Sequence, residues 1–471
     1  MSGRIADELA GIDVGDERLN RRSKEVIEAL SVDPAASING SFEKWSDTLA
    51  AYRLFDNPNV TPAAILEPHY QATLARIAEE PVVLIVQDTT ELDFTKHAPK
   101  DARCLNKAKR FGLYQHTHLA VTPAGLPLGV VGAKTFDRSA DSLGKTLERR
   151  DLPTEEKESF RWLEGYRIAD KISQQCPKTQ IVNVADREAD MYDIFLEAQQ
   201  ESDAPRADFI IRSKEQRSTN ERIPPSEHGK RIAVYRKFRD DVSDSPVRIR
   251  TTISLPATPK RAAREAEVEI RAKEVTLRHP KNRKGLPDVK CSIVYVQEVS
   301  TPQDGSEPLQ WWLITSLPVA TIEDILRVVE YYKARWTVEV YFKVLKSGCK
   351  VEEIQLETTA RLKNSLAFYQ IIAWRILYLT HLNRECPNVP CNTVFEDYEW
   401  QPVWRVTTRK EVPAKPPMLS EFMALLSSLG GYNNRAGERP PGPQPIWIGL
   451  RRMVDLTRAW LTFGPPTQTY V

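Results

Sequence analysis

The segment Val82-Val-Leu-Ile-Val-Gln-Asp88-Thr-Thr decides the fold class of this 471-residue chain. Its five consecutive apolar residues predict a strand buried on both faces, as in the parallel part of an α/β sheet. A second segment, Ile181-Val-Asn-Val-Ala-Asp186, repeats the pattern and also ends in an aspartate. Open α/β sheets bind their ligands at the carboxyl ends of such strands. Taken singly, an aspartate in this place more often caps a turn or a helix, so neither residue defines a site alone.

The pattern of apolar and polar residues along the rest of the chain divides it into parts. Residues 1–70 show helical periodicity, and from about residue 81 short apolar runs alternate with helical segments such as 160–168, which predicts a mixed α/β domain. A more polar part from about 215 to 310 alternates in the manner of antiparallel strands. The strands expected in it cover 248–255, 266–271, 275–277 and 291–296.

Helical patterns return after residue 320. One helix is expected over 322–346 and an amphipathic one over 362–382. An uneven, proline-rich segment, 387–418, precedes two final helices, one ending at Leu429-Gly-Gly431 and one carrying apolar residues from Trp447 to Trp460. We therefore expect helical flanking domains at 1–70 and 371–471 around an α/β domain at 71–370.

Composition restricts the class of protein. Apolar residues make up 41% and charged residues 28%, which is typical of a soluble globular protein. No apolar run approaches the roughly 18 residues of a membrane span, and the acidic start does not resemble a signal peptide. The six cysteines form no CxxC pair, so we expect a reducing cytoplasm and no membrane. The net charge of +2 comes from 66 basic and 64 acidic residues, so charge alone does not indicate a nucleic-acid partner.

The stretch from Tyr332 to Lys346 places a glutamate, Glu339, among cations on one expected helix. One carboxylate cannot hold a catalytic divalent cation by itself, but Asp88, Asp186 and Glu339 together supply the oxygen ligands that Mg²⁺ prefers. Spacing alone does not exclude other acids as ligands. These competitors are Glu91, Asp93, Glu188, Asp190 and Asp193.

These motifs resemble those of a known family, the bacterial DDE transposases of insertion-sequence family four, transposon-Five type. The segments Val-Gln-Asp88-Thr-Thr and Asp186-Arg-Glu-Ala-Asp match its first two acidic motifs. The pattern Tyr332-x2-Arg335-x3-Glu339-x6-Lys346 matches its Tyr-Arg-Glu-Lys signature with the spacing intact. Further similar positions span nearly the whole chain.

The resemblance implies an RNase H-like catalytic core with a β insertion, an amino-terminal domain that binds transposon ends, and a carboxyl-terminal dimerisation domain. It implies cut-and-paste transposition through a hairpin intermediate, by a homodimer bound to double-stranded transposon ends and target DNA in the nucleoid. Asp88, Asp186 and Glu339 would be catalytic and would hold two Mg²⁺ ions, for which Mn²⁺ substitutes.

The resemblance also implies a set of DNA-binding residues. Trp311 would receive a base flipped out of the duplex, while nearby cations and a tyrosine would grip the phosphates. A simpler interpretation makes Trp311 a core residue; because it and Trp312 face opposite sides of a strand, one of them is expected in the core. The expected DNA-binding residues are Arg212, Lys214, Trp311, Tyr332, Arg335, Lys343 and Lys346, with Arg18, Arg22 and Arg53 at the amino terminus.

Three interpretations stay open at this point. The first is an active transposase, the second a DNA-binding relative or inhibitor that no longer cuts, and the third a stand-alone Mg²⁺-dependent nuclease. The basic residues of the β insertion fit two roles equally, contact with phosphate or protection of sheet edges. These residues are Arg261, Arg264, Lys281, Arg283 and Lys284.

Overall fold

Contacts group the chain into two compact units. Unit 1 comprises Met1–Arg76, Thr89–Lys145 and Thr337–Val471, and unit 2 comprises Ile77–Asp88 and Thr146–Trp336. The chain thus enters each unit more than once. The computed structural model describes residues 5–105, 109–138, 153–224, 233–256, 261–302 except 282 and 284, and 304–464 except 436, 437 and 439.

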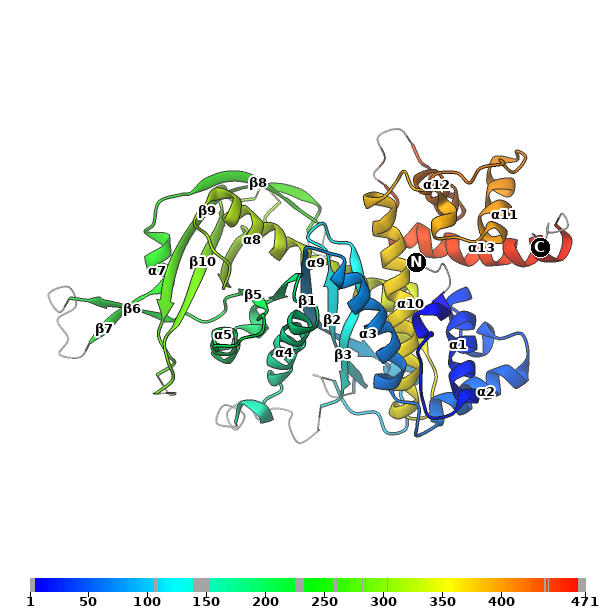
Figure 1. Ribbon diagram of the computed structural model, residues 1–471, viewed down its shortest axis with the longest axis horizontal. Coiled ribbons are helices and arrows are strands. Elements are labelled where there is room, and N and C mark those ends of the chain that lie inside the picture. Colours follow the sequence, from blue (N-terminus) through cyan, green and yellow to red (C-terminus); the bar gives the residue numbers. More distant parts are fainter. Residues whose placement is uncertain are drawn as a thin grey trace. The chain divides into compact units, whose positions relative to one another are not determined.

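Unit 2 is built on a mixed sheet (Figure 1). Its strands are the first part of β1 (Val82–Asp93), β4 (Gln180–Ala185), β5 (Asp208–Arg212), β6 (Ser218–Ile223), β7 (Val234–Lys237), β8 (Ile249–Leu255), β9 (Arg264–Leu277), β10 (Val289–Glu298) and β11 (Gln310–Thr315). Neighbouring strands follow the order β1-β4-β5-β11-β10-β9-β6-β7, and β8 pairs with β9. The strands β1, β4 and β5 are parallel, whereas the pairs from β5–β11 onward are antiparallel.

Helices cover the sheet of unit 2 and complete its core. They are α4 (Phe160–Gln175), α5 (Tyr192–Ala198), α7 (Phe238–Ser243) and α8 (Ile322–Ala334), with short turns η6 (Thr154–Glu156) and η7 (Arg187–Ala189). α4 packs on β4, and α8 packs on β4, β5 and β10. The rings of Phe195 and Phe209 stack with centroids 5.1 Å apart, joining α5 to β5. Burial of these large apolar side chains is what fixes the helices on the sheet.

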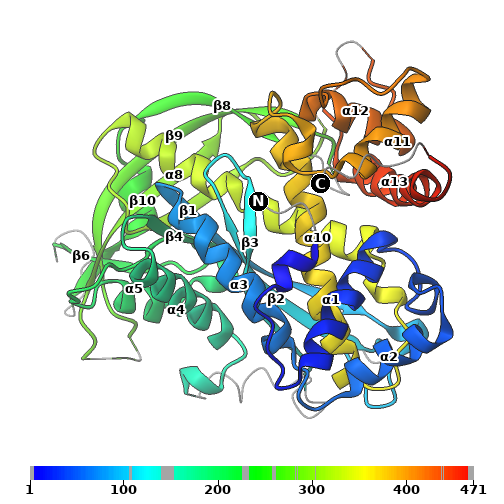
Figure 2. The ribbon, with the colours of Figure 1, turned by 45° about the vertical axis from the view of Figure 1, so that its right-hand side comes forward.

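Unit 1 combines a β-hairpin with helices gathered around α10 (Figure 2). Its elements are η1 (Ile5–Leu9), α1 (Glu17–Val32), η2 (Asn39–Ser41), α2 (Trp45–Asp56), α3 (Pro62–Ala78, which runs past the boundary of the unit), η3 (Thr95–His97), β2 (Gly112–Val121), β3 (Pro127–Phe136), α9 (Trp336–Lys343), the π-helical turn η8 (Val344–Gly348), η9 (Val351–Glu353), α10 (Thr359–Glu385), η10 (Cys391–Thr393), α11 (Asp397–Thr408), α12 (Leu419–Leu429) and α13 (Pro443–Phe463). α10 contacts β3, α1, α2, α12 and α13. In the part of the chain that the structure describes, none of the helices is long and apolar enough to cross a bilayer.

The strand order β3-β2-β1-β4-β5 confirms the expected RNase H-like core. In unit 1, β2 and β3 form an antiparallel hairpin next to β1, and in unit 2, β1, β4 and β5 run parallel. The antiparallel strands that follow β5 in sequence and precede α8 confirm the expected β insertion. The boundaries 1–70, 71–370 and 371–471 stay predictions, and residue 371 lies within α10.

Two expected strand boundaries were wrong. β1 does not stop at Asp88 but continues to Asp93, because Thr89 and Thr90 are good strand formers that tolerate partial exposure. The two strands expected at 266–271 and 275–277 are one strand, β9, whose alternating burial continues through Ala272. The insertion also contains α7, whose Phe238 packs edge-on against Trp312.

The single helix expected over 322–346 is divided. α8 ends at Ala334, and the backbone N–H of Arg335 bonds to the carbonyl of Tyr332, which tightens the turn before α9 begins. After α9 the helix widens into the π-helical turn η8, where the N–H of Cys349 reaches the carbonyl of Val344. Helical periodicity in a sequence does not show such local changes of pitch.

The helical tail also differs from expectation. The segment expected to be irregular contains α11, which tolerates Pro402 because Trp400, Pro402 and Val403 are buried against the neighbouring helices. α10 is buried around most of its circumference rather than along one stripe, since helices and β3 surround it. The two final helices, α12 and α13, were expected correctly.

Candidate nucleic-acid cleavage site

Asp88 and Asp186 lie at matching positions on adjacent parallel strands of unit 2. Val86 of β1 is in register with Val184 of β4, and each aspartate comes two residues later. Neighbouring strands lie about 4.8 Å apart, so two side chains at this position can reach one ligand. Both aspartates are partly exposed, at the point where the burial of their strands ends. The sheet thus brings together two of the three predicted metal ligands.

Arg335 contacts the first of these aspartates. Its Nη1 donates a hydrogen bond to Oδ2 of Asp88 over 2.9 Å. The side chains of Arg335 and Asp88 are 15% and 20% exposed, so solvent screens this ion pair only in part. Arg335 is therefore held beside a predicted metal ligand, a contact that the sequence did not predict.

A cavity of about 800 Å³ in unit 2 collects the predicted DNA-binding residues Arg212, Trp311, Tyr332 and Arg335. Its wall also contains Arg261, one of the insertion residues whose role the sequence left open. The cavity is also lined by Gln310 and Lys333, which no sequence pattern singled out. An aromatic face among several cations suits a nucleotide, which combines a π surface with an anionic phosphate.

The structure separates the roles of Trp311 and Trp312. Trp312 is 8% exposed and stacks on Tyr295 with ring centroids 3.7 Å apart, so it belongs to the core. Trp311 lines the cavity and meets Tyr332 edge-on at 5.1 Å. The expectation that one tryptophan is in the core is confirmed, and the other is the one available to a ligand.

Tyr332 links the cavity to the aspartates. Burial raises the pKa of its hydroxyl, while the nearby guanidinium groups of Arg335 and Arg212 act in the opposite direction and Asp186 adds to the rise. The hydroxyl therefore stays protonated at neutral pH and can donate a hydrogen bond. Because Arg335 lines the cavity and also contacts Asp88, the cavity and the aspartate edge adjoin within unit 2.

The other residues of the Tyr-Arg-Glu-Lys stretch lie in unit 1. Glu339 is half-buried on α9, Lys343 is exposed at the end of that helix, and Lys346 lies 3.9 Å from Glu352. Because Asp88 and Asp186 belong to unit 2, the convergence of Glu339 with them stays a prediction. Lys214, in unit 2, is exposed directly after β5.

The amino-terminal arginines lie on the first helices. Arg18 and Arg53 are exposed, on α1 and α2 respectively. Arg22 is partly buried and pairs with Glu25 at 3.0 Å and with Asp47 at 3.5 Å, which joins α1 to α2. Arg18 and Arg53 thus keep the exposure that a DNA contact requires, whereas Arg22 has a structural role as well.

The competing acids are all held by arginines. The pairs are Glu91 and Asp93 with Arg110, Glu188 with Arg161, Asp190 with Arg217, and Asp193 with Arg283. The hydrogen bonding of Arg283 to Asp193 is the largest influence that raises the pKa of Arg283. Asp88 is itself paired with Arg335, so these ion pairs alone do not separate the two groups of acids. What sets Asp88 and Asp186 apart is their matching position on adjacent parallel strands.

The basic residues of the insertion differ in their surroundings. Arg264 is bound by Glu298, and Arg283 is bound by Asp193 with both terminal nitrogens at 2.7 and 2.8 Å. Lys281 is exposed and lines a cavity of about 550 Å³ with Arg278 and Tyr235. Lys284 lies outside the described residues. Lys281 and Arg261 are therefore the members of this set with a surface suited to phosphate.

The donor set at the strand edge fits a divalent cation. Carboxylate oxygens are the ligands that Mg²⁺ and Mn²⁺ prefer, and Asp88 and Asp186 present them side by side. Within the described ranges, no group of three or more His, Cys, Asp or Glu side chains is arranged to hold a metal ion.

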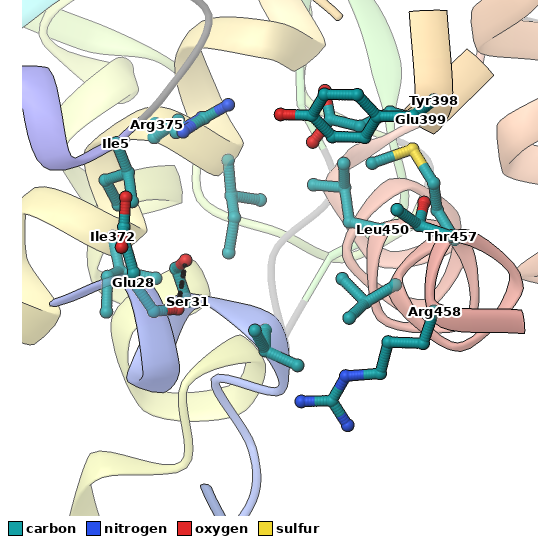
Figure 3. A pocket seen from close by; sticks show the side chains of 14 residues that line it. Ile5, Glu28, Ser31, Ile372, Arg375, Tyr398, Glu399, Leu450, Thr457 and Arg458 are labelled. Carbon is teal, nitrogen blue, oxygen red and sulfur yellow. Dashed lines mark hydrogen bonds between the residues drawn. The ribbon is translucent and has the colours of Figure 1, made fainter. Parts of the chain in front are cut away.

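A separate cavity of about 250 Å³ lies in unit 1 among η1, α1, α10, α11 and α13 (Figure 3). Arg375 and Glu399 line it, and the side chain of Arg375 extends toward Tyr398 and Glu399. Burial lowers the pKa of Arg375 and raises that of Glu399. None of the predicted site residues lines this cavity.

Among solved structures, the chain is similar to one described as the cryo-EM structure of the piggyBac transposase synaptic complex with hairpin DNA. The match covers 100% of this chain and 76% of that chain, with 10% sequence identity and a TM-score of 0.35. A likeness this distant says nothing about the function of the chain.

Three protein-family models match consecutive parts of the sequence. Residues 1–60 match a model for transposase DNA-binding, residues 174–375 a transposase DDE domain, and residues 371–459 the transposase Tn5 dimerisation domain. The matches occur in the expected order and together cover most of the chain. The DDE model includes Asp186, the cavity residues and the Tyr-Arg-Glu-Lys stretch. The chain belongs to the Tn5-type DDE transposases of insertion-sequence family four.

Proposed function

We propose that this chain is an active cut-and-paste transposase that cleaves DNA at transposon ends, closes the ends through a hairpin, and joins them to target DNA. The observation that carries the proposal is the position of Arg335, which contacts Asp88 and lines the cavity that contains Trp311. One side chain thus connects a predicted metal ligand with a predicted nucleotide pocket.

We propose Asp88, Asp186 and Glu339 as the catalytic carboxylates. The first two share one edge of the sheet in unit 2. Glu339 follows Arg335 by four residues and lies half-buried on α9 in unit 1. These three residues would hold two Mg²⁺ ions, or Mn²⁺ in their place. When bound, such ions lower the pKa of an attacking water and stabilise charge on the phosphate oxygens.

The remaining residues of the site bind and orient the DNA. The ion pair with Asp88 fixes the guanidinium of Arg335, which would contact a phosphate near the scissile bond. Arg212 lines the same cavity and donates to the carbonyl of Gln310 at 3.2 Å, so its guanidinium is also held in place. Fixed cations of this kind reduce the reorganisation that the transition state would otherwise require.

Formation of a hairpin requires one base to leave the stacked bases of the duplex. Extrusion of one base relieves the strain of a sharp turn at a duplex end, and it costs roughly a few kcal/mol of lost stacking. Trp311 offers a ring face that accepts any base, and the hydroxyl of Tyr332 would donate to an adjoining phosphate oxygen.

A homodimer in a synaptic complex is part of the proposal. The carboxyl-terminal helix α13 ends in exposed apolar residues, with Leu461 59% and Phe463 86% exposed. A groove of about 590 Å³ between α11 and α13 carries Val406 and Trp460. An apolar surface of this kind suits a protein partner, and the dimerisation-domain match makes a second copy the natural one. A bacterial cytoplasmic location, on the nucleoid when bound to DNA, belongs to the same proposal.

The decisive experiment uses purified protein, Mg²⁺ and linear DNA that carries the terminal repeats flanking the gene. We expect hairpinned ends, which Glu339→Gln abolishes while end binding is retained. Glu330→Gln on α8 is the matched control, because Glu330 is an exposed glutamate paired with Lys333. It is expected to behave as wild type.

Each alternative predicts a different result of this experiment. Wild-type protein that binds the ends but never cuts them would be the inactive DNA-binding relative. Nicking without preference for the ends would indicate a stand-alone nuclease. Activity that survives Glu339→Gln would remove this glutamate from the proposed catalytic set.

A further inference from the structure

Asp190 is a buried carboxylate that binds a neighbouring loop from several sides. Its side chain is 1% exposed and lies directly after η7, the turn that follows β4. Oδ2 accepts hydrogen bonds from the backbone N–H groups of Lys214 and Glu215, both at 2.7 Å, and from the hydroxyl of Ser213 at 3.3 Å. Oδ1 forms an ion pair with Nη1 of Arg217 at 2.6 Å. Both oxygens of the carboxylate are therefore engaged by the segment 213–217.

Arg217 closes this arrangement. Its Nη2 donates to the backbone carbonyl of Asp190 at 3.0 Å, its side chain is 11% exposed, and its guanidinium lies 5.3 Å from the ring centroid of Phe195. A buried cation in such a place depends on its anionic partner, because the loss of that partner leaves an uncompensated charge. The Asp190–Arg217 ion pair is thus a rigid buried contact rather than a flexible surface ion pair.

The contacts between Asp190 and the segment 213–217 connect two parts of the proposed cleavage site. Asp186 precedes Asp190 by four residues, and its Oδ1 accepts from the N–H of Glu188 at 2.8 Å, so Asp186 is fixed on the same short turn. On the other side, β5 ends at Arg212, immediately before the loop that Asp190 binds, and Lys214 belongs to that loop. One carboxylate joins the turn that bears a predicted metal ligand to the loop that contains Lys214 and directly follows Arg212.

We infer that Asp190 is a positioning residue for DNA cleavage, which sets the distance between Asp186 and the cations Arg212 and Lys214. The inference rests on the proposed function. Asp190 touches neither DNA nor metal, because its two oxygens serve the loop. It acts by holding the phosphate-binding side chains in register with the metal-binding edge, where a displacement of about 1 Å is enough to slow catalysis by about 100-fold.

The test compares Asp190→Asn with Asp193→Asn. Asparagine keeps the volume of Asp190, but it removes the charge and turns an N–H₂ donor toward donors of the loop. Asp193 is a suitable control since it lies three residues away on α5 and accepts two hydrogen bonds from Arg283, which is not part of the 213–217 loop.

We expect three results for Asp190→Asn. Amide hydrogen exchange of residues 213–217 increases at least about tenfold, since the loop loses its acceptor. Single-turnover nicking of end DNA in Mg²⁺ falls by about 10- to 100-fold, while end binding measured without metal stays within about threefold of wild type. Mn²⁺ restores part of the nicking rate, because Mg²⁺ demands more nearly ideal geometry. Asp193→Asn leaves all three measurements close to wild type.

Other outcomes overturn the inference. Nicking by Asp190→Asn at the wild-type rate would show that cleavage does not depend on the contacts between Asp190 and the loop. Equal losses of nicking in Asp193→Asn, or a parallel loss of end binding in Asp190→Asn, would reveal a general structural defect. Wild-type protein that fails to nick the ends would instead remove the proposed function itself. Should Asp190→Asn not fold, Arg217→Gln gives a milder test, since the backbone bonds to Asp190 remain. Its nicking rate is expected to fall by about 3- to 10-fold, and an unchanged rate would count against the inference.

Discussion

Arg335 and Asp88 are 247 residues apart in sequence, yet Nη1 of the arginine lies 2.9 Å from Oδ2 of the aspartate. The contact joins the end of α8 to β1 within unit 2, beside the cavity that Trp311 and Tyr332 line. A guanidinium that lines the cavity is thus already aligned with a predicted metal ligand. Pre-alignment of this kind is the structural basis for the predictions about the site.

Arg335→Gln is expected to slow end nicking by about 10- to 100-fold, because a hydrogen bond to a charged group is worth about 1.5–3 kcal/mol and about 1.4 kcal/mol changes a rate tenfold. Single-turnover kinetics on end DNA would measure this. Arg327→Gln, which removes an exposed i,i+3 pair with Asp324 on the same helix, should leave the rate unchanged. A similar loss in both variants would mean that nicking depends on the overall charge of α8 and not on the contact between Arg335 and Asp88.

Trp311→Ala is expected to slow hairpin closure far more than first-strand nicking, since only closure needs an extruded base. Separate quantification of nicked and hairpinned products on a denaturing gel would show the difference. Trp312→Ala should instead destabilise the protein by about 3–5 kcal/mol, as expected for a large core side chain. If Trp311→Ala affects both steps alike, or lowers stability as Trp312→Ala does, the proposed base pocket is wrong.

Lys281→Ala is expected to lower the slope of log K against log salt for end binding by about 1, because one phosphate contact is lost. Lys281 is exposed, whereas Arg283 is engaged by Asp193. Arg283→Ala should therefore reduce thermal stability with little change in the slope. Binding titrations across a range of salt concentrations measure both. An unchanged slope for Lys281→Ala would leave this lysine as an edge charge.

Stability of unit 1 is expected to fall as the pH drops below about 6.5. The Nε2 atom of buried His69 accepts from the N–H of Val130 at 3.0 Å, so the proton resides on Nδ1, which donates to Glu8. Burial lowers the pKa of His69 below its usual 6.5, against the opposing effect of Glu8. The pKa of Glu8 is lowered to about 2: burial acts to raise it, but His69 and Arg76 outweigh that effect.

The sign follows from proton uptake on unfolding. Both groups bind protons more readily in the unfolded chain, so the stabilisation is complete above pH 6.5 and is lost as the pH falls, first through His69 and below about 4.5 through Glu8, by at most about 1.4 kcal/mol per pH unit for each group. Calorimetry at pH 7.5 and 5.5 would detect the lower melting temperature. His69→Gln should weaken this dependence, and His97→Gln, at an exposed position, should not. A melting temperature that is independent of pH would contradict the assignment.

Several features of the fold could be predicted because they depend on local patterns. The buried strand around Val82–Val86, the antiparallel insertion and the final helices follow from apolar periodicity and turn residues. Local patterns were insufficient where packing overrides propensity. Pro402 lies within α11 because its neighbours are buried, and Arg335 interrupts a segment whose periodicity is helical throughout.

The candidate site was predicted in composition rather than in arrangement. Motif spacing identified Asp88, Asp186 and the signature around Glu339, but it did not exclude acids such as Asp190 and Asp193. The structure places Asp88 and Asp186 at matching positions on adjacent strands, while Asp190 and Asp193 are bound by Arg217 and Arg283. An ion pair between residues far apart in sequence leaves no local pattern, and for this reason spacing could not exclude them.

The sequence by itself determined the class of sheet and the family, because apolar runs and motif spacing are properties of consecutive residues. Only the tertiary structure decided that Trp312 packs in the core while Trp311 lines a cavity, and that Arg335 reaches Asp88. Alternation along a strand states that two neighbours face opposite sides, but which side is filled depends on what packs there. That choice is made by side chains brought together from distant parts of the chain, and so it appears only once the chain is folded.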